Sequence, residues 1–250
     1  MTLGIIQLQL DDTVYVILNV LGGCMPTLIG LLLFYKEEGI PKLKEVLKRG
    51  IDPRKVKKLW WIPLLLLTPL INATALLLGI LAGGSTPNLP YFSQWYLIPV
   101  LFIVGYIPIS NAFREEFGWR GYAIERLQTR QNALVTSLII GVAWGLWHLP
   151  LFYFPTAVDV YANKPFWLFL TNTITLSIIM TWLYNNNNGS IFTGITAHIV
   201  FNLAPSIFQF EKAGLGIYFN MVLLLITAIF IVFYYRYQTF VRGSKEITPA

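Results

Sequence analysis

Long stretches without a charged residue constrain this chain more than any other feature. There are five of them, and they cover residues 13–35, 59–113, 131–158, 165–210 and 213–235. Each exceeds the roughly 20 apolar residues that a helix needs to cross a bilayer. Since 56% of the chain is hydrophobic and only 12% is charged, an ordinary soluble enzyme is excluded. The continuous runs also exclude an outer-membrane barrel, whose strands alternate over about ten residues.

Turn-forming residues divide the two longest stretches. A cluster rich in Gly, Pro and Asn interrupts one at 83–90, and a run of Asn interrupts the other at 185–189. The sequence therefore predicts an all-α fold, a polytopic membrane helical bundle of about seven transmembrane helices, which forms a single integral membrane domain over residues 1–250. The predicted spans are 13–34, 59–82, 95–122, 133–155, 165–184, 190–207 and 214–235. The spacing of Gly79 with Gly83, and of Gly141 with Gly145, favours close packing of helices.

Basic residues gather on one side of this layout. Of the 18 Lys and Arg residues, 16 fall in segments 35–58, 114–130 and 236–245, and Lys164 and Lys212 fall on the other side. Because short basic loops stay in the cytoplasm, we expect a multi-pass protein of the cell membrane with its N-terminus outside and its C-terminus cytoplasmic. The net charge of +6 follows from this asymmetry, so nucleic acid is not expected as a partner. Segment 35–58 fits either a solvated loop or a basic amphipathic helix on lipid.

Few ionisable residues lie inside the predicted spans, where such residues are costly and mark functional sites. With one amide a turn further on, they are Glu115, Glu116, Arg120, His148, His198 and Asn202. Glu116 and Arg120 are four residues apart and share a helix face, so we interpret them as a structural ion pair. Glu115 points about 100 degrees away from Glu116 and is the candidate base.

An antiparallel hairpin of residues 115–130 and 131–148 would place Glu115 opposite His148, each about 24 Å from the tip. His198 lies about 13 Å from its own turn, so the levels coincide if the hairpin tip projects about 11 Å further. The site would then lie roughly 10 to 15 Å below the cytoplasmic face. A carboxylate beside an imidazole can take a proton from water, and His with Asn can donate to an oxyanion. This is the minimum equipment of a hydrolase.

These residues resemble the motifs of one family. Glu115-Glu116-Phe-Gly-Trp-Arg120 resembles the EExxxR motif of the CPBP group, the intramembrane CAAX proteases and bacteriocin-processing enzymes also called the Abi family. Trp144-Gly-Leu-Trp-His148 and His198-Ile-Val-Phe-Asn202 are similar to its WxxxH and HxxxN motifs, so residues 95–207 would form the catalytic core.

The resemblance implies a role for each residue. Glu115 and His148 would activate water, and His198 and Asn202 would stabilise the oxyanion. Glu116 and Arg120 would organise the site.

The resemblance also implies a prokaryotic intramembrane endopeptidase. Such an enzyme would hydrolyse a hydrophobic or lipid-modified peptide, in CAAX-type cleavage or in bacteriocin and peptide processing and self-immunity. The expected partners are a peptide or a prenylated or lipidated protein that arrives from the cytoplasmic side or from lipid. Two alternatives stay open. One is a non-catalytic immunity or partner-binding scaffold, and the other is a proton-coupled transporter that uses the same Glu and His as a relay.

No cofactor is favoured. Glu115, His148 and His198 could supply three zinc ligands, so a zinc metalloprotease is the alternative to a glutamate-type enzyme. Asn202 is a poor zinc ligand, and no second carboxylate is free to act as base, so we favour metal-free hydrolysis. The sequence contains no Walker A motif and no complete GxGxxG motif, which argues against a nucleotide cofactor.

Overall fold

The computed structural model describes residues 12–107, 110–152 and 165–242, and within these ranges the chain is helical and contains no strand. The α-helices of these ranges are α1 (Asp12–Ile51), α2 (Trp61–Leu81), α3 (Pro90–Ser93), α4 (Leu97–Val104), α5 (Asn111–Glu116), α6 (Ile124–Gln128), α7 (Ala133–His148), α8 (Phe166–Asn186), α9 (Ile191–Phe208) and α10 (Gly216–Tyr234). Short helical segments between them are η1 (Pro53–Lys55), η2 (Lys58–Trp60), the π-helix η3 (Phe117–Ala123), η4 (Leu149–Phe152) and η5 (Phe210–Lys212).

Six segments of the described chain are long and apolar enough to cross a membrane. They are Val20–Ile51, Lys58–Leu81, Ala133–Phe152, Phe166–Asn186, Ile191–Lys212 and Gly216–Tyr234. This confirms the predicted helical membrane bundle. Part of the span predicted at 133–155, namely its last three residues, lies outside the described residues.

The span predicted at 95–122 is wrong as a single helix. The chain forms α4, leaves the helix after Gly105, and starts again at α5 with Ser110 as an extended N-cap residue. The hydroxyl of Ser110 donates to the carbonyl of Gly105 at 2.6 Å, which stabilises the break. Pro108, which lies outside the described residues, cannot donate a backbone hydrogen bond and so does not favour a continuous helix. Glu115 and Glu116 thus lie on a separate short helix, at its C-terminal end, in place of the middle of one long span.

Helix α1 extends well past its predicted end at residue 34. It runs to Ile51 with a sharp change of direction at Gly39, whose φ of 76° is readily adopted by glycine. The basic segment 35–58 is therefore largely helical, which rules out the solvated loop.

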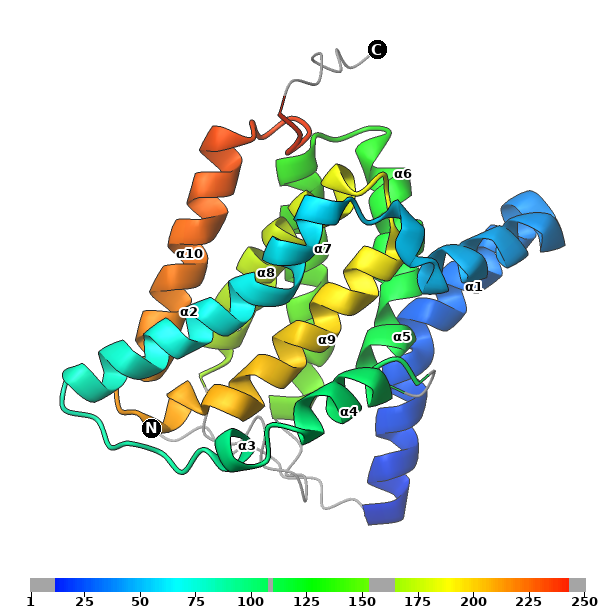
Figure 1. Cartoon of the computed structure of the whole chain (residues 1–250). Coiled ribbons are helices and arrows are strands. Elements are labelled where there is room, and N and C mark those ends of the chain that lie inside the picture. Colours follow the sequence, from blue (N-terminus) through cyan, green and yellow to red (C-terminus); the bar gives the residue numbers. More distant parts are fainter. Residues whose placement is uncertain (1–11, 108–109, 153–164, 243–250) are drawn as a thin grey trace, which may run out of the picture.

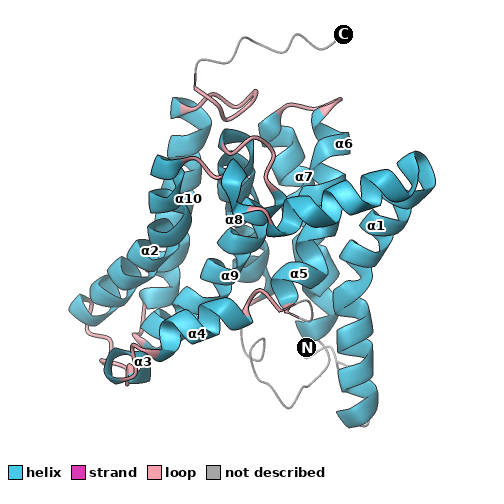
Figure 2. Ribbon diagram, turned by 45° about the vertical axis from the view of Figure 1, so that its right-hand side comes forward, coloured by secondary structure: helices cyan, strands magenta, loops and turns pink. Residues whose placement is uncertain are grey.

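Helix α9 occupies the centre of the bundle. It has the largest buried share of the six possible spans, at 61% of its most apolar window. Figures 1 and 2 show α2 and α10 on one side of α9 and α1 on the opposite side. Helices α5 and η3 lie between α1 and α9 and contact both. This position holds the EExxxR motif in the interior of the protein.

Three of the four small-residue positions predicted for helix packing have that role. A Cβ atom on Gly141 would lie 2.6 Å from the Cα of Ile174 in α8, and one on Gly145 would lie 2.6 Å from Leu170. A Cβ atom on Gly79 would lie 2.4 Å from the carbonyl oxygen of Ala213. Gly83 differs, because its Cβ position is open and its φ is 91°. Gly83 therefore serves the turn after α2.

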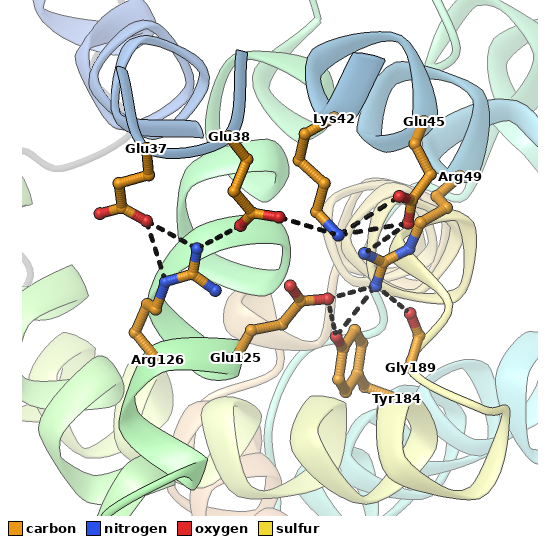
Figure 3. A network of polar contacts seen from close by, with 9 residues as sticks. All are labelled: Glu37, Glu38, Lys42, Glu45, Arg49, Glu125, Arg126, Tyr184 and Gly189. Carbon is orange, nitrogen blue, oxygen red and sulfur yellow. Dashed lines mark hydrogen bonds and ion pairs between the residues drawn. The ribbon is translucent and has the colours of Figure 1, made fainter. Parts of the chain in front are cut away.

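A network of charged side chains fastens the second half of α1 to the rest of the bundle (Figure 3). Arg126 of α6 donates to Glu37 at 2.6 Å and to Glu38 at 2.7 Å. Arg49 pairs with Glu125 and donates to the carbonyl of Gly189 at 2.8 Å. The network joins α1 and α6 to the turn between α8 and α9.

The same end of the bundle collects most of the basic segments, and we refer to it as the basic end. It contains residues 40–58, the turn between α6 and α7, the turn between α8 and α9, and residues 235–242. Backbone and amide hydrogen bonds join these segments, including Ala133 N to Gln238 O at 2.8 Å and Asn186 Nδ2 to Phe240 O at 2.7 Å. Lys212 lies at the opposite end in η5, whereas Lys164 and Lys245 lie outside the described residues.

Arg120 does not belong to a basic loop as the orientation prediction assumed. Its side chain is fully buried, because η3 continues into the interior of the bundle.

Candidate active site

The two adjacent glutamates of α5 make different contacts. Glu115 is 3% exposed, and its Oε2 accepts a hydrogen bond from the indole Nε1 of Trp144 at 2.7 Å. Glu116 is fully buried, and its Oε1 lies 3.1 Å from Nη1 of Arg120. The predicted ion pair is therefore present, and the two carboxylates have different partners.

Glu116 also binds one of the histidines, which the sequence did not indicate. Its Oε1 lies 2.7 Å from Nδ1 of His198 in α9. An ionised carboxylate can only accept, so the imidazole donates through Nδ1. Nε2 is then the ring nitrogen of His198 that remains to meet a substrate. Glu116 thus orients His198 in addition to pairing with Arg120.

His148 is the last residue of α7. Its Nδ1 lies 2.9 Å from the carbonyl oxygen of Trp144, one turn earlier in the helix. A carbonyl accepts, so this contact places the proton on Nδ1 and makes Nε2 the basic nitrogen of the neutral ring. The ring lies among aromatic side chains, with centroids 4.6 Å from Trp147 and 5.1 Å from Phe169.

Trp144 connects the groups of the site, and the sequence reasoning did not assign it a role. It binds Glu115 through its side chain and His148 through its backbone, and its ring centroid is 5.4 Å from that of His198. The guanidinium carbon of Arg120 lies 5.2 Å from the centroid of the Trp144 ring. The signal was the WxxxH spacing, because residues four apart share a helix face. Trp144, one turn before His148, therefore links Glu115 to His148.

A cavity of about 740 Å³ brings the predicted residues together. Glu115, Trp144, His148, His198 and Asn202 all line it. Asn202 is exposed on the cavity side of α9, one turn beyond His198. The remaining predicted residues, Glu116 and Arg120, are fully buried and do not line the cavity.

The cavity extends away from the basic end. Beyond the site it is lined by Pro90 and Tyr91 of α3 and by Gln209 and Lys212 near η5, which belong to the opposite end of the bundle (Figure 1). Helix α7 starts at the basic end and reaches His148 after about 23 Å. This length agrees with the predicted distance of about 24 Å between His148 and the hairpin tip.

The predicted projection of the hairpin was too large. Gln128 and Asn185 exchange two amide hydrogen bonds, of 3.1 and 3.0 Å, so the turn between α8 and α9 meets α6 about one helical turn from the hairpin tip. That distance is about 5 Å, against the predicted 11 Å. The histidines still reach one cavity, because α9 crosses the bundle obliquely (Figure 1).

Glu115, His148 and His198, the alternative zinc ligands, line the same cavity. Among the described residues, no group of three or more His, Cys, Asp and Glu side chains is placed to hold a metal ion. Nδ1 of His198 and Nδ1 of His148 are engaged by Glu116 and a backbone carbonyl, and Glu115 is held by Trp144. The site thus provides acid, base and hydrogen-bond donor groups.

Comparison with known proteins identifies a family and a relative. Residues 94–204 match the family model described as type II CAAX prenyl endopeptidase Rce1-like, and this range contains all six predicted site residues. A protein of Methanococcus maripaludis named CAAX prenyl protease 2 is 30% identical over 200 residues. The match covers 76% of this chain and 72% of that relative.

The fold and the buried polar site define a multi-pass membrane protein of the protease class. Within that class, the chain belongs to the Rce1-like family of type II CAAX prenyl endopeptidases. The resemblance found in the three motifs is thereby confirmed.

Proposed function

We propose that the protein hydrolyses a peptide bond in a prenylated or otherwise hydrophobic peptide, inside the membrane and without a metal ion. The observation that carries the proposal is the joint placement of Glu115, His148, His198 and Asn202 on one cavity. Its volume of about 740 Å³ is sufficient for several residues of a ligand.

Glu115 and His148 form the base assembly. Trp144 holds Oε2 of Glu115, so the other carboxylate oxygen can meet a water. The water oxygen attacks the carbonyl carbon of the scissile bond, and its proton moves to the carboxylate or to Nε2 of His148. Collapse of the tetrahedral intermediate breaks the C–N bond, and the proton passes to the leaving amine.

His198 and Asn202 stabilise the oxyanion of the intermediate. They are four residues apart on α9, which places both on the face that lines the cavity. Asn202 donates through its amide, and a protonated His198 donates through Nε2 while Glu116 holds Nδ1. Glu116 and Arg120 act as positioning residues.

The relative and the cavity lining support this substrate class. The relative is named a prenyl protease, and the cavity of this chain combines apolar walls, such as Phe169, Phe201 and Leu224, with polar groups. Apolar walls suit a prenyl group, and polar groups suit the attached peptide.

The proposal is tested with purified protein and two synthetic peptides of identical sequence that end in a CAAX motif, one farnesylated and one not. Mass spectrometry should detect release of the three C-terminal residues from the farnesylated peptide. Glu45→Gln is the matched control variant, because Glu45 is a surface carboxylate of α1, and its rate should equal that of wild type. Failure of wild type to cleave either peptide would contradict the proposed activity on this substrate class.

A further inference from the structure

Three asparagines line the same cavity and have no part in the chemistry described above. Asn72 lies on α2, Asn172 on α8 and Asn220 on α10, and α10 contacts both of the other two helices. A buried amide is costly in an apolar helix unless it is hydrogen-bonded. Asn72 and Asn220 are buried, and Asn172 is half-buried with its Oδ1 atom buried, so their place at the cavity requires an explanation.

Asn72 has an unused donor. Its Oδ1 accepts from Nδ2 of Asn220 at 2.8 Å, and the residue is 2% exposed. Its own Nδ2 is buried and has no hydrogen-bond partner in the described part of the chain.

Asn172 has an unused acceptor. Its Oδ1 is buried and likewise meets no donor among the described residues. The neighbouring Thr173 does not supply one, because its hydroxyl donates to the carbonyl of Leu170 within α8.

A role in joining helices explains the bond between Asn72 and Asn220 but not the two unpaired atoms. The bond between Asn72 and Asn220 ties α2 to α10, as amides often do in membrane bundles. That role leaves Nδ2 of Asn72 and Oδ1 of Asn172 without a function. Both residues that carry an unused atom line the cavity in which Glu115 and His148 also lie.

An unused N–H and an unused C=O are together the complement of a peptide backbone. An extended peptide offers carbonyl oxygens and N–H groups along its length, whereas a hydrocarbon chain offers neither. Backbone contacts of this kind give affinity with little dependence on side-chain sequence.

We infer that Asn72 and Asn172 bind the backbone of the substrate peptide, Asn72 by donating to a carbonyl and Asn172 by accepting from an N–H. The inference rests on the proposed function in that it takes the ligand to be a peptide. Asn220 is a positioning residue, because it holds Oδ1 of Asn72 and so directs Nδ2 of Asn72 to the ligand.

The experiment measures peptide binding separately from cleavage. The probe is a fluorescein-labelled farnesylated peptide ending in a CAAX motif, with a series of analogues in which one backbone amide at a time is replaced by an ester. Anisotropy titrations use full-length protein in the Glu115→Gln background, and melting temperatures are recorded for each variant. Cleavage of the same parent peptide is followed in the wild-type background.

Asn172→Leu should weaken binding of the parent peptide about tenfold, which is the usual effect of one hydrogen bond. In protein that retains Asn172, one particular ester replacement in the peptide should weaken binding by a similar factor. The same replacement should not change binding by the Asn172→Leu variant. Since the substitution removes an unpaired buried acceptor, the melting temperature should stay the same or rise. Asn72→Leu should also weaken binding, and Asn220→Leu should lower both binding and melting temperature.

Asn186→Leu is the matched control. Asn186 is buried at the basic end and donates to the carbonyls of Trp182 and Phe240, away from the cavity. This variant should melt earlier and bind the peptide as wild type does.

The inference would be overturned if Asn172→Leu left both the affinity for the peptide and its sensitivity to the ester replacement unchanged. It would also be overturned if the Glu115→Gln protein that retains Asn172 failed to bind the peptide. Asn172-dependent binding without cleavage by wild type would contradict the proposed hydrolysis and leave this inference intact. Cleavage that does not depend on Asn172 would support the proposed hydrolysis and contradict this inference.

Discussion

The indole N–H of Trp144 donates to Oε2 of Glu115 at 2.7 Å, and both residues are almost completely buried. This bond joins α5 to α7 and fixes the carboxylate that we propose as the base. The backbone of Trp144 also binds His148, so one residue positions both members of the base assembly.

Trp144→Phe should therefore impair catalysis while preserving the fold. The substitution retains an aromatic ring but removes the donor to a charged group, and such bonds typically contribute about 1.5 to 3 kcal/mol. We expect kcat on the farnesylated peptide to fall by about 10-fold to 100-fold with little change in KM. A Trp144→Phe protein with unchanged kcat would show that the bond does not position the base.

The buried ion pair predicts a loss of stability. Arg120→Ala leaves Glu116 without its guanidinium partner in the interior, and breaking such a pair commonly costs about 3 to 5 kcal/mol. The variant should give a lower folded yield and a lower melting temperature in detergent. If it were as stable as wild type yet inactive, Arg120 would instead belong to the catalytic group.

The orientation in the membrane is a further prediction. The basic end should face the cytoplasm, because short basic segments are retained there. Reporter fusions after Gly50 and after Ala250 should both report a cytoplasmic position. A signal from the outer side at either fusion would overturn the orientation.

Metal removal should leave the activity unchanged. The purified protein should contain far less than one equivalent of zinc and should keep cleaving the farnesylated peptide after chelation and dialysis. Loss of cleavage on chelation that added zinc restores would establish the metalloprotease alternative.

Much of the site could be predicted from sequence, because its motifs rely on helix periodicity. The pairing of Glu116 with Arg120 and the shared face of His198 and Asn202 follow from four-residue spacing. Ionisable residues in apolar spans also stand out by their rarity.

Other features depend on contacts between distant segments and left no local signal. The hydrogen bond of His198 to Glu116 joins residues 82 positions apart. The amides of Asn72, Asn172 and Asn220 come from three helices and meet only at the cavity. The predicted projection of the hairpin tip was wrong for a similar reason. Counting residues along each helix does not take account of the oblique path of α9 through the bundle (Figure 1).

The most direct test of the account is the rate at which Glu115→Gln cleaves the farnesylated peptide. Glutamine preserves the size of the side chain and can still accept from Trp144, but it cannot take a proton from water at neutral pH. Rates should fall by about 10² to 10⁴, the usual contribution of a general base, and Asn202→Ala should lose about 10² to 10³. Both variants should fold, and Glu45→Gln should match wild type. Undiminished cleavage by a folded Glu115→Gln protein would contradict the mechanism.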